Sequence, residues 1–255
     1  MSDHRQQILD QFTRQAVPFA TATGINNEAA LRLMVEFVGA GPADTVLDVA
    51  CGPGLVVCAF ARVARHATGI DLTPAMLDRA RATQQERGLT NVTWRLGDVL
   101  PLPYPDGAFS IVTSRFAFHH FQDPRAVLGE MRRVCAPGGR VLVVDTEASP
   151  DPVKAAEFNR MEILRDPSHV RAMPLIELTA LFRDAGFPLP RRTSYRLESE
   201  LEELLGRSFP KPGDAERIRE IFAASLEDDR LGIPLQRDGS RIRYAYPVAV
   251  LAADR

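Results

Sequence analysis

LDVACGPG, residues 47–54, is the stretch of sequence that decides the fold. Its first half is mostly apolar, and its second half holds Gly52 and Gly54 with a single proline between them. Glycine has no side chain, so these positions let the backbone turn sharply and let a ligand approach it closely. In an open parallel sheet the ligand crevice lies at the carboxyl ends of the strands. The stretch therefore predicts a buried strand that runs into a ligand-binding loop.

Strand and helix patterns alternate on both sides of this loop. Thr73 and Asp123 each precede a proline, which is the usual order of a helix cap and the first helical residue. The Pro-Gly-Gly run at 137–139 is expected to end the helix that begins at Pro124. Such alternation indicates right-handed crossovers and a mostly parallel sheet that is covered on both faces. Strands are expected at 45–50, 66–72, 92–98, 109–115 and 140–147, and helices at 55–65, at 74–88 and from 124 onward.

The pattern changes after the fifth expected strand. Residues 148–174 are rich in proline and charge, and they predict an irregular or helical insertion. A second charged stretch, at 198–230, has the character of interrupted helices. Apolar residues alternate at 240–254 after an Asp-Gly turn, which predicts a last strand that runs antiparallel to its neighbours. A helix at 174–187 and a strand at 192–198 complete the expected elements.

The composition argues against several classes of partner. The 255 residues are 45% hydrophobic and 25% charged, with 31 basic and 33 acidic side chains and a net charge of −2. No basic block is present, so neither nucleic acid nor an anionic membrane is an expected partner. The N-terminus lacks an apolar signal core, which favours a soluble, cytoplasmic protein. The spacing of Cys51, Cys58 and Cys135 fits neither a disulfide framework nor a zinc site, so we expect no metal and three packing residues.

Two carboxylates near the glycine loop indicate the kind of ligand. Asp71 ends the next expected strand and suits the two vicinal hydroxyls of a ribose. A nicotinamide dinucleotide would favour a third glycine where Val57 stands, and its pyrophosphate would be repelled by Asp48. Asp48 better suits a nucleoside with a cationic end. S-adenosylmethionine, which carries an ammonium and a sulfonium and no phosphate, meets that description.

Four segments together resemble a known family. VLDVACGPG, GIDLTPAML, GDVLPLPYPDGAFSIVTSRFAFHHFQDP and MRRVCAPGGRVLVVD resemble motifs of the class I S-adenosylmethionine-dependent methyltransferases, in the subgroup that includes ubiquinone/menaquinone-biosynthesis C-methyltransferases. The resemblance is close over 30–147 and looser over 174–196 and 240–252. It implies a Rossmann-like, doubly wound α/β fold with a mostly parallel seven-stranded sheet, an antiparallel last strand and helical cap insertions. It also implies methyl transfer to a small-molecule acceptor, a cyclic or aromatic metabolite, with S-adenosylhomocysteine as the product.

The resemblance implies a role for each of ten residues. Asp48, Ala50, Gly52 and Gly54 would line the methionine end of the cofactor, Asp71 would bind the ribose, Leu72 and Met76 would pack on the adenine, Asp98 and Val99 would hydrogen-bond the adenine edge, and Arg115 would face the cofactor crevice. Each position also has a purely structural interpretation: the glycines can form a simple turn, Asp71 can cap a helix, Asp98 can belong to a turn, and Arg115 can form a surface ion pair.

Methyl transfer from a sulfonium needs positioning of the acceptor and, for some acceptors, removal of a proton. His119 and His120 follow the fourth expected strand at the crevice. We expect His119 to be the candidate base and His120, nearer the Asp123 helix start, to be mainly structural. The alternative is that neither histidine takes a proton and that positioning alone supports the reaction.

The expected organisation is a single domain, 1–255, with a helical segment at 1–40, a cofactor-binding core at 41–147 and substrate-cap insertions at 148–174 and 197–238. Two other functions stay open at this point. One is a relative that binds S-adenosylmethionine for a structural purpose or a non-methylating reaction, and the other is an NAD(P)-dependent oxidoreductase. The sequence leaves the acceptor, the methylated atom and the oligomeric state open.

Overall fold

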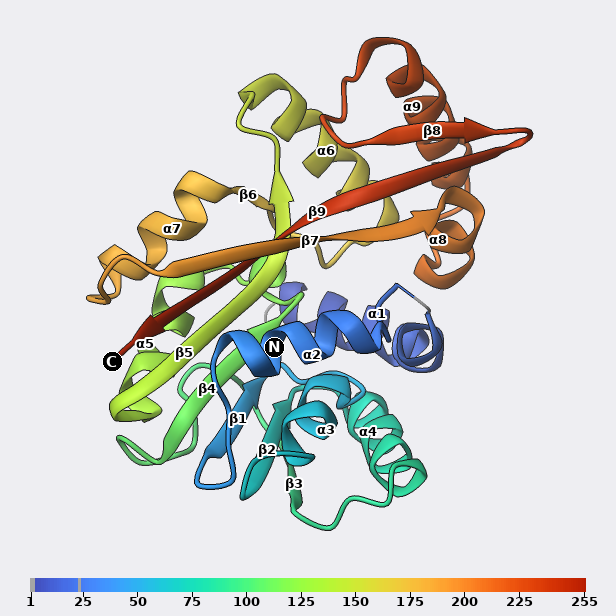
Figure 1. Ribbon diagram of the computed structural model, residues 1–255. Coiled ribbons are helices and arrows are strands. Elements are labelled where there is room, and N and C mark those ends of the chain that lie inside the picture. The colour runs from blue at the N-terminus through green and yellow to red at the C-terminus, as the bar shows by residue number, and fades with distance from the viewer. Residues whose placement is uncertain (1–2, 23) are drawn as a thin grey trace.

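A nine-stranded sheet runs through the computed structural model, which describes residues 3–22 and 24–255, and seven of its strands form a main path in the order β3-β2-β1-β4-β5-β9-β7 (Figure 1). Strands β1 to β5 are parallel where they pair, and β9 is antiparallel to both of its neighbours. The predicted Rossmann-like fold with an antiparallel last strand is therefore confirmed. The strands on this path are β1 (Thr45–Val49), β2 (His66–Asp71), β3 (Val92–Leu96), β4 (Phe109–Arg115), β5 (Cys135–Ala148), β7 (Arg191–Glu200) and β9 (Arg241–Asp254). Two short strands pair off this path, β6 (Met173–Pro174) with β5 and β8 (Leu235–Asp238) with β9.

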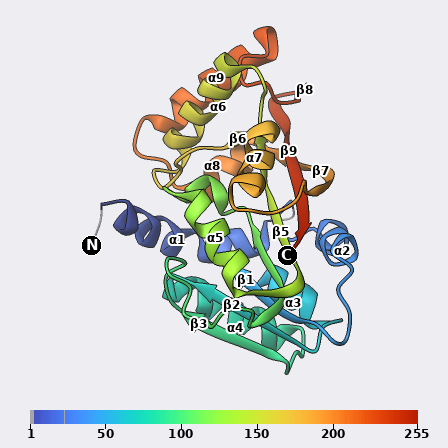
Figure 2. The same cartoon turned by 90° about the vertical axis from the view of Figure 1, so that its left-hand side faces the viewer.

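Helices cover both faces of the sheet because successive strand residues point to opposite sides. Val46 packs in the apolar cluster of one face, and its neighbour Leu47 packs in the cluster of the other. Figure 2 shows α2 (Glu28–Phe37) and α3 (Leu55–Ala61) on one side and α5 (Pro124–Val134) and α7 (Leu175–Asp184) on the other. Helix α4 (Pro74–Glu86) packs beside α3. Burial on both faces explains why these strands are continuously apolar.

Three local predictions differ in detail from the structure. Helix α3 ends at Ala61, four residues before the expected end. Helix α5 ends at Val134, before the Pro-Gly-Gly run, and β5 begins at once. The run at 137–139 lies inside β5, where the register against β4 shifts and Gly138 takes a φ of +72°. Glycine tolerates that left-handed backbone, so the run forms a bulge and not a helix stop.

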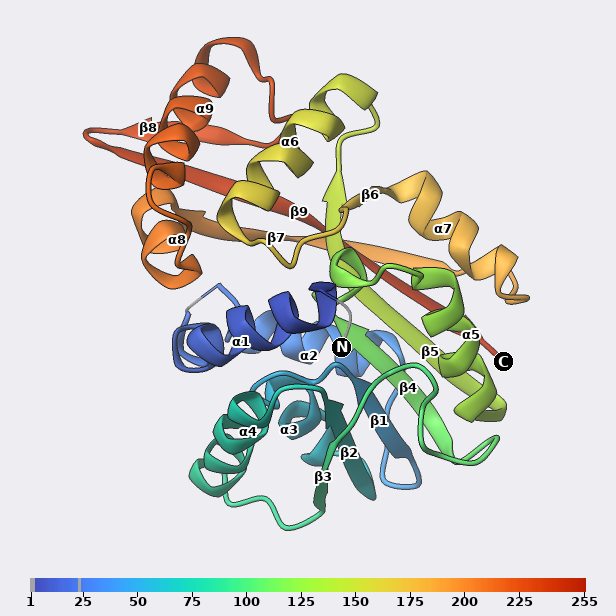
Figure 3. The same cartoon turned by 180° about the vertical axis from the view of Figure 1, so that it is seen from behind.

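The remaining helices lie beyond the carboxyl ends of the parallel strands. The expected insertions contain α6 (Pro152–Arg165), α8 (Leu201–Ser208) and α9 (Asp214–Asp228), and α6 packs on α9. Helix α1 (Asp3–Thr21) lies between this upper group and the core, in contact with α4 and α8 (Figure 3). A 3-10 turn, η1 (Phe118–His120), follows β4. Within the described part of the chain, no helix is both long and apolar enough to cross a membrane.

Candidate active site

The loop after β1 and the start of α4 are held together by one carboxylate. Gly52 and Thr73 donate their backbone N–H groups to the two oxygens of Asp71, each at 2.8 Å. Ala50 and Gly52 take positive φ angles of +57° and +50°, which turn the chain sharply after the strand. The Thr73 side chain, at the N-cap of α4, makes no capping bond. Asp71 therefore joins the loop after β1 to the residue before α4, and it also faces the ligand cavity.

Gly54 is required for packing behind the loop. Its φ is +78°, and a Cβ atom there would lie 2.4 Å from Cη2 of Trp94 and 2.9 Å from Cβ of Ala80. Gly54 is not among the residues that line the cavity, whereas Gly52 is. The contact of Gly54 with a ligand stays a prediction, and the role that the structure gives this glycine is to admit the Trp94 ring.

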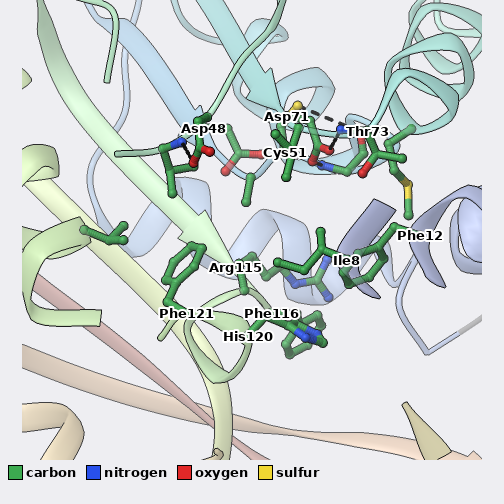
Figure 4. A pocket seen from close by; sticks show the side chains of 18 of the residues that line it. Ile8, Phe12, Asp48, Cys51, Asp71, Thr73, Arg115, Phe116, His120 and Phe121 are labelled. Carbon is green, nitrogen blue, oxygen red and sulfur yellow. Dashed lines mark hydrogen bonds between the residues drawn. The ribbon is translucent and has the colours of Figure 1, made fainter. Parts of the chain in front are cut away.

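A cavity of about 390 Å³ lies at the carboxyl ends of the strands, and residues of helix α1 line part of it. This volume is within the usual range for small-molecule sites, roughly 300–1,000 Å³. In Figure 4, Asp48 and Asp71 lie on one side of it, with Phe12 and His120 on the other. Helix α1 contributes Ile8, Phe12 and Phe19 to the lining. The predicted cofactor-binding residues in the lining are Asp48, Ala50, Gly52, Asp71, Leu72, Met76, Asp98, Val99 and Arg115.

Asp48 is a buried carboxyl group in the lining of this cavity. It is 2% exposed, and its Oδ1 has no hydrogen-bond partner among the described residues. Burial raises the pKa of Asp48 well above its ordinary value; the charge of Arg115 opposes this shift and that of Asp71 adds to it. A buried carboxylate with a free oxygen is costly unless a cation or donor reaches it. The site therefore fits the cationic end of a ligand.

Arg115 lies at the end of β4 and lines the same cavity. Its Nη1 donates to the carbonyl of Ile25 at 3.0 Å, and its Nε donates to the Tyr195 hydroxyl at 3.3 Å. Its Nη2 is buried without a partner among the residues described, and its guanidinium lies 4.5 Å from the centre of the Phe116 ring. Arg115 is 8% exposed, so the surface ion-pair alternative is wrong.

Asp98 lies at the far side of the cavity, after β3. Its carboxylate contacts the guanidinium of Arg5 from α1, and its Oδ1 accepts the backbone N–H of Val99 at 2.7 Å. Sequence reasoning did not indicate Arg5, because nothing in the local pattern of a surface helix shows which strand end it will cover. The contact ties α1 to the strand end that the sequence assigned to the adenine.

The two histidines occupy different places. His119 is buried with its Nδ1 2.5 Å from Oδ1 of Asp145, and it does not line the main cavity. It lines a second cavity, of about 60 Å³. His120 lines both cavities, and its Nδ1 contacts the carbonyl of Ser168 at 3.0 Å. His120 therefore has the structural contact that was expected and, in addition, a place in the ligand site that sequence reasoning missed.

Comparisons with known proteins agree with this geometry. Residues 47–143 match the family described as a methyltransferase domain. The uncharacterised methyltransferase YcgJ of Bacillus subtilis is 40% identical over 217 residues, which cover 84% of this chain and 85% of that protein. This chain belongs to the class I S-adenosylmethionine-dependent methyltransferases.

Solved structures extend the comparison to the fold of this methyltransferase. The crystal structure of YcgJ superimposes with a TM-score of 0.81 over 90% of this chain and 99% of that one, at 29% identity. A putative methyltransferase from Bacillus halodurans gives a TM-score of 0.82 over 89% and 98%, at 26% identity. A demethylmenaquinone methyltransferase from Thermus thermophilus is 42% identical over 113 residues, 44% of this chain and 50% of that protein.

The cofactor of the methyltransferase is S-adenosylmethionine, which supplies an electrophilic methyl group on a sulfonium. The residues present fit it, because the orphaned Oδ1 of Asp48 meets the need of a cationic end. Asp71, at the end of the neighbouring strand β2, offers carboxylate oxygens in the same cavity. Leu72 and Met76 add apolar surface suited to a flat ring.

Proposed function

We propose that this methyltransferase transfers the methyl group of S-adenosylmethionine to a small-molecule acceptor with a cyclic or aromatic part. The observation that carries the proposal is the cover over the site: α1 lies across the cavity, so the acceptor must fit beneath a helix. Phe12, Phe19 and Phe116 supply aromatic surface that can contact a ring. A demethylmenaquinone methyltransferase among the relatives is named for a cyclic substrate.

In this proposal each part of the cavity has a task. Asp48 and Gly52 bind the methionine end, Asp71 binds the ribose, and Arg115 offers its free Nη2 to an anionic group of the ligand. Leu72 and Met76 pack on the adenine, Asp98 and Val99 hold its edge, and Ala50 shapes the turn beside it. The enclosing helices exclude water, which would otherwise compete with the acceptor for position.

The helices of the two insertions complete the proposed acceptor side. Leu204 and Ser208 of α8 and Glu162 of α6 line the second cavity, which shares Phe12 and His120 with the first. We infer that these helices act as a substrate cap, because they close the side of the molecule on which the strand ends open. The proposal implies that the enzyme acts in the cytoplasm, in the metabolism of small molecules.

The test uses S-adenosylmethionine labelled in the methyl group, incubated with the protein and a cell extract that has been separated into small-molecule, protein and nucleic-acid fractions. We expect label to enter the small-molecule fraction only, together with S-adenosylhomocysteine. Label in protein or RNA would contradict the proposal. Tight binding of S-adenosylmethionine with no transfer to any fraction would favour the non-methylating alternative.

Asp48→Asn is the test variant for this assay, and Asp106→Asn is its matched control. Asp48→Asn keeps the shape of the side chain and removes its charge, so we expect cofactor binding to weaken and labelling to fall together. Asp106→Asn, in a turn that does not line the cavity, should leave both unchanged.

A further inference from the structure

The second cavity has the features of a site for a compact polar group. It is lined from several elements, with Thr146 from β5, Glu162 and Arg165 from α6, Arg207 from α8 and Tyr246 from β9. Its volume of about 60 Å³ is too small for a ring, since an engineered cavity that holds benzene is about 150 Å³. A group of a few atoms can enter it while the rest of the molecule stays in the larger cavity.

Within this cavity, His119 is held by a rigid carboxylate. Asp145 contacts His119 Nδ1 at 2.5 Å and accepts the backbone N–H groups of His119 at 3.0 Å and of Thr146 at 2.7 Å. The carboxylate cannot donate when ionised, so Nδ1 carries the proton and Nε2 keeps its lone pair in the neutral ring. His119 Nε2 has no hydrogen-bond partner in the described part of the chain. This is the arrangement of a proton acceptor with a positioning residue behind it.

The other charges around His119 favour a single site of protonation. Glu162 and Arg165 face it from α6, and the rings of His120 and His169 lie 4.3 and 5.4 Å from its ring centre. Burial lowers the pKa of His119, but the charge and hydrogen bond of Asp145 more than reverse this, so the pKa is raised. Burial and the charge of His119 lower the pKa of His120 to about 4 and also lower that of His169. A proton that arrives in this cluster therefore resides on His119.

Arg207 is the cation in the lining that lacks an acidic partner. Arg165 is neutralised by Glu162, at 2.6 Å, with Asp166 at 3.9 Å. Arg207 makes only long contacts with the hydroxyls of Ser199 and Tyr244, at 3.3 and 3.5 Å, and no carboxylate of the described residues lies within 4 Å of it. A half-buried guanidinium that lacks a counter-charge can balance the negative charge of an oxyanion.

We propose that the second cavity binds an acidic hydroxyl group of the methyl acceptor, that His119, positioned by Asp145, takes its proton, and that Arg207 balances the oxyanion. This inference rests on the proposed function. The O–H electron pair stays on the acceptor and the proton moves to His119 Nε2. The oxyanion oxygen would then form a bond to the methyl carbon as the C–S bond breaks, with the electrons of that bond left on sulfur, and His119 would return its proton to water.

The test uses 4-nitrophenol, whose phenolate absorbs visible light and whose neutral form does not. The probe is added to the protein saturated with S-adenosylhomocysteine, at a pH one unit below the ordinary pKa of the probe. We expect the bound probe to be largely ionised. Arg207→Gln should weaken its binding roughly tenfold to a hundredfold, the range for a lost charged hydrogen bond, and His119→Gln should abolish the rise in phenolate absorbance.

Matched variants separate this role from simple loss of structure. Arg207→Lys keeps the charge and should keep most of the absorbance rise. His169→Gln changes the neighbouring ring, which does not line either cavity, and should keep it fully. Asp145→Asn leaves a side chain of the same size that no longer fixes the proton on Nδ1 of His119. It should therefore reduce the rise in phenolate absorbance. Unlike Arg207→Gln, it should not lower the affinity for the probe.

The outcomes distinguish the two levels of the proposal. If S-adenosylhomocysteine binds to the protein but the probe binds without ionising, or not at all, the acceptor site is wrong and the cofactor site stands. Equal ionisation in the wild-type protein, Arg207→Gln and His119→Gln would overturn it as well. If S-adenosylhomocysteine itself fails to bind, the proposed function fails.

Discussion

The carboxyl group of Asp48 lines the main cavity and is buried. In the free protein its pKa is raised well above the ordinary value, first by burial. A ligand with a cationic end stabilises the ionised form, so binding drives a proton off Asp48. Affinity for S-adenosylmethionine should accordingly fall as the pH drops through that raised pKa, because the protonated form must first be ionised.

We predict that cofactor binding, at pH values below the raised pKa of Asp48, releases up to one proton per site through this linkage. Calorimetry in two buffers that differ in ionisation enthalpy measures the number released. Asp48→Asn cannot release that proton, so its binding enthalpy should depend less on the buffer. If the variant and the wild-type protein release the same number, Asp48 is already ionised in the free protein.

A second prediction at the residue scale concerns His120. The unfolded chain protonates this side chain near pH 6.5, whereas burial and the charge of His119 lower the folded pKa to about 4; Asp166 and the Ser168 carbonyl oppose that shift, and Arg165 adds to it. Between these values the unfolded state binds more protons, so stability falls as the pH falls, by about 1.4 kcal/mol per pH unit for each proton. We expect a shallower slope in His120→Gln, measured by urea unfolding between pH 6.5 and 4. Parallel slopes would show that His120 takes up its proton equally in both states.

The sequence predicts some of these residues and not others for a physical reason. Asp48 and Asp71 could be predicted because adjacent parallel strands bring their carboxyl ends to one edge of the sheet. His119 and His120 are neighbours in a 3-10 turn, and spacing alone does not fix which ring reaches the cavity. Arg207 is distant in sequence, and only the packing of α8 brings it to the second cavity.

At the scale of elements, the turn between β1 and α3 depends on a close contact with β3. Gly54 leaves room for the Trp94 ring, and Gly69 on β2 does the same, since a Cβ there would lie 2.7 Å from that ring. Trp94 is fixed in turn by the bond from its Nε1 to Gln84 Oε1, at 2.7 Å. The local sequence does not indicate this packing role of Gly54, because the large side chain that needs the space lies forty residues away.

We predict that Gly54→Ala destabilises the protein by roughly 2–5 kcal/mol, from the clash with Trp94 and the left-handed backbone together. Adding Trp94→Leu should regain the part that comes from the clash, so the double variant should melt at a higher temperature than Gly54→Ala. Gly206→Ala is the control, because its Cβ would meet nothing within 4 Å and its φ is not positive. It should melt at or above the wild-type temperature. If Trp94→Leu does not restore any stability, the whole loss of stability in Gly54→Ala comes from the backbone conformation.

At the scale of the whole molecule, α1 joins the two halves of the proposed site. Phe12 and Phe19 line both cavities, and the contact of Arg5 with Asp98 ties the start of the helix to the core. Helix α1 forms part of the lining of the main cavity, so local opening of this helix would expose the ligand site. A bound ligand adds contacts to Ile8 and Phe12 and makes that opening less frequent.

We predict that S-adenosylhomocysteine slows amide hydrogen exchange in α1 more than in any helix that does not line the main cavity, measured by mass spectrometry of peptides. Helix α9 is the internal control, because none of its residues lines either cavity. Phe12→Ala should reduce the protection of α1, since it removes one of the two aromatic rings of the helix that line both cavities. Equal slowing in α1 and α9 would mean that the ligand stabilises the fold globally, and that α1 does not open by itself to admit it.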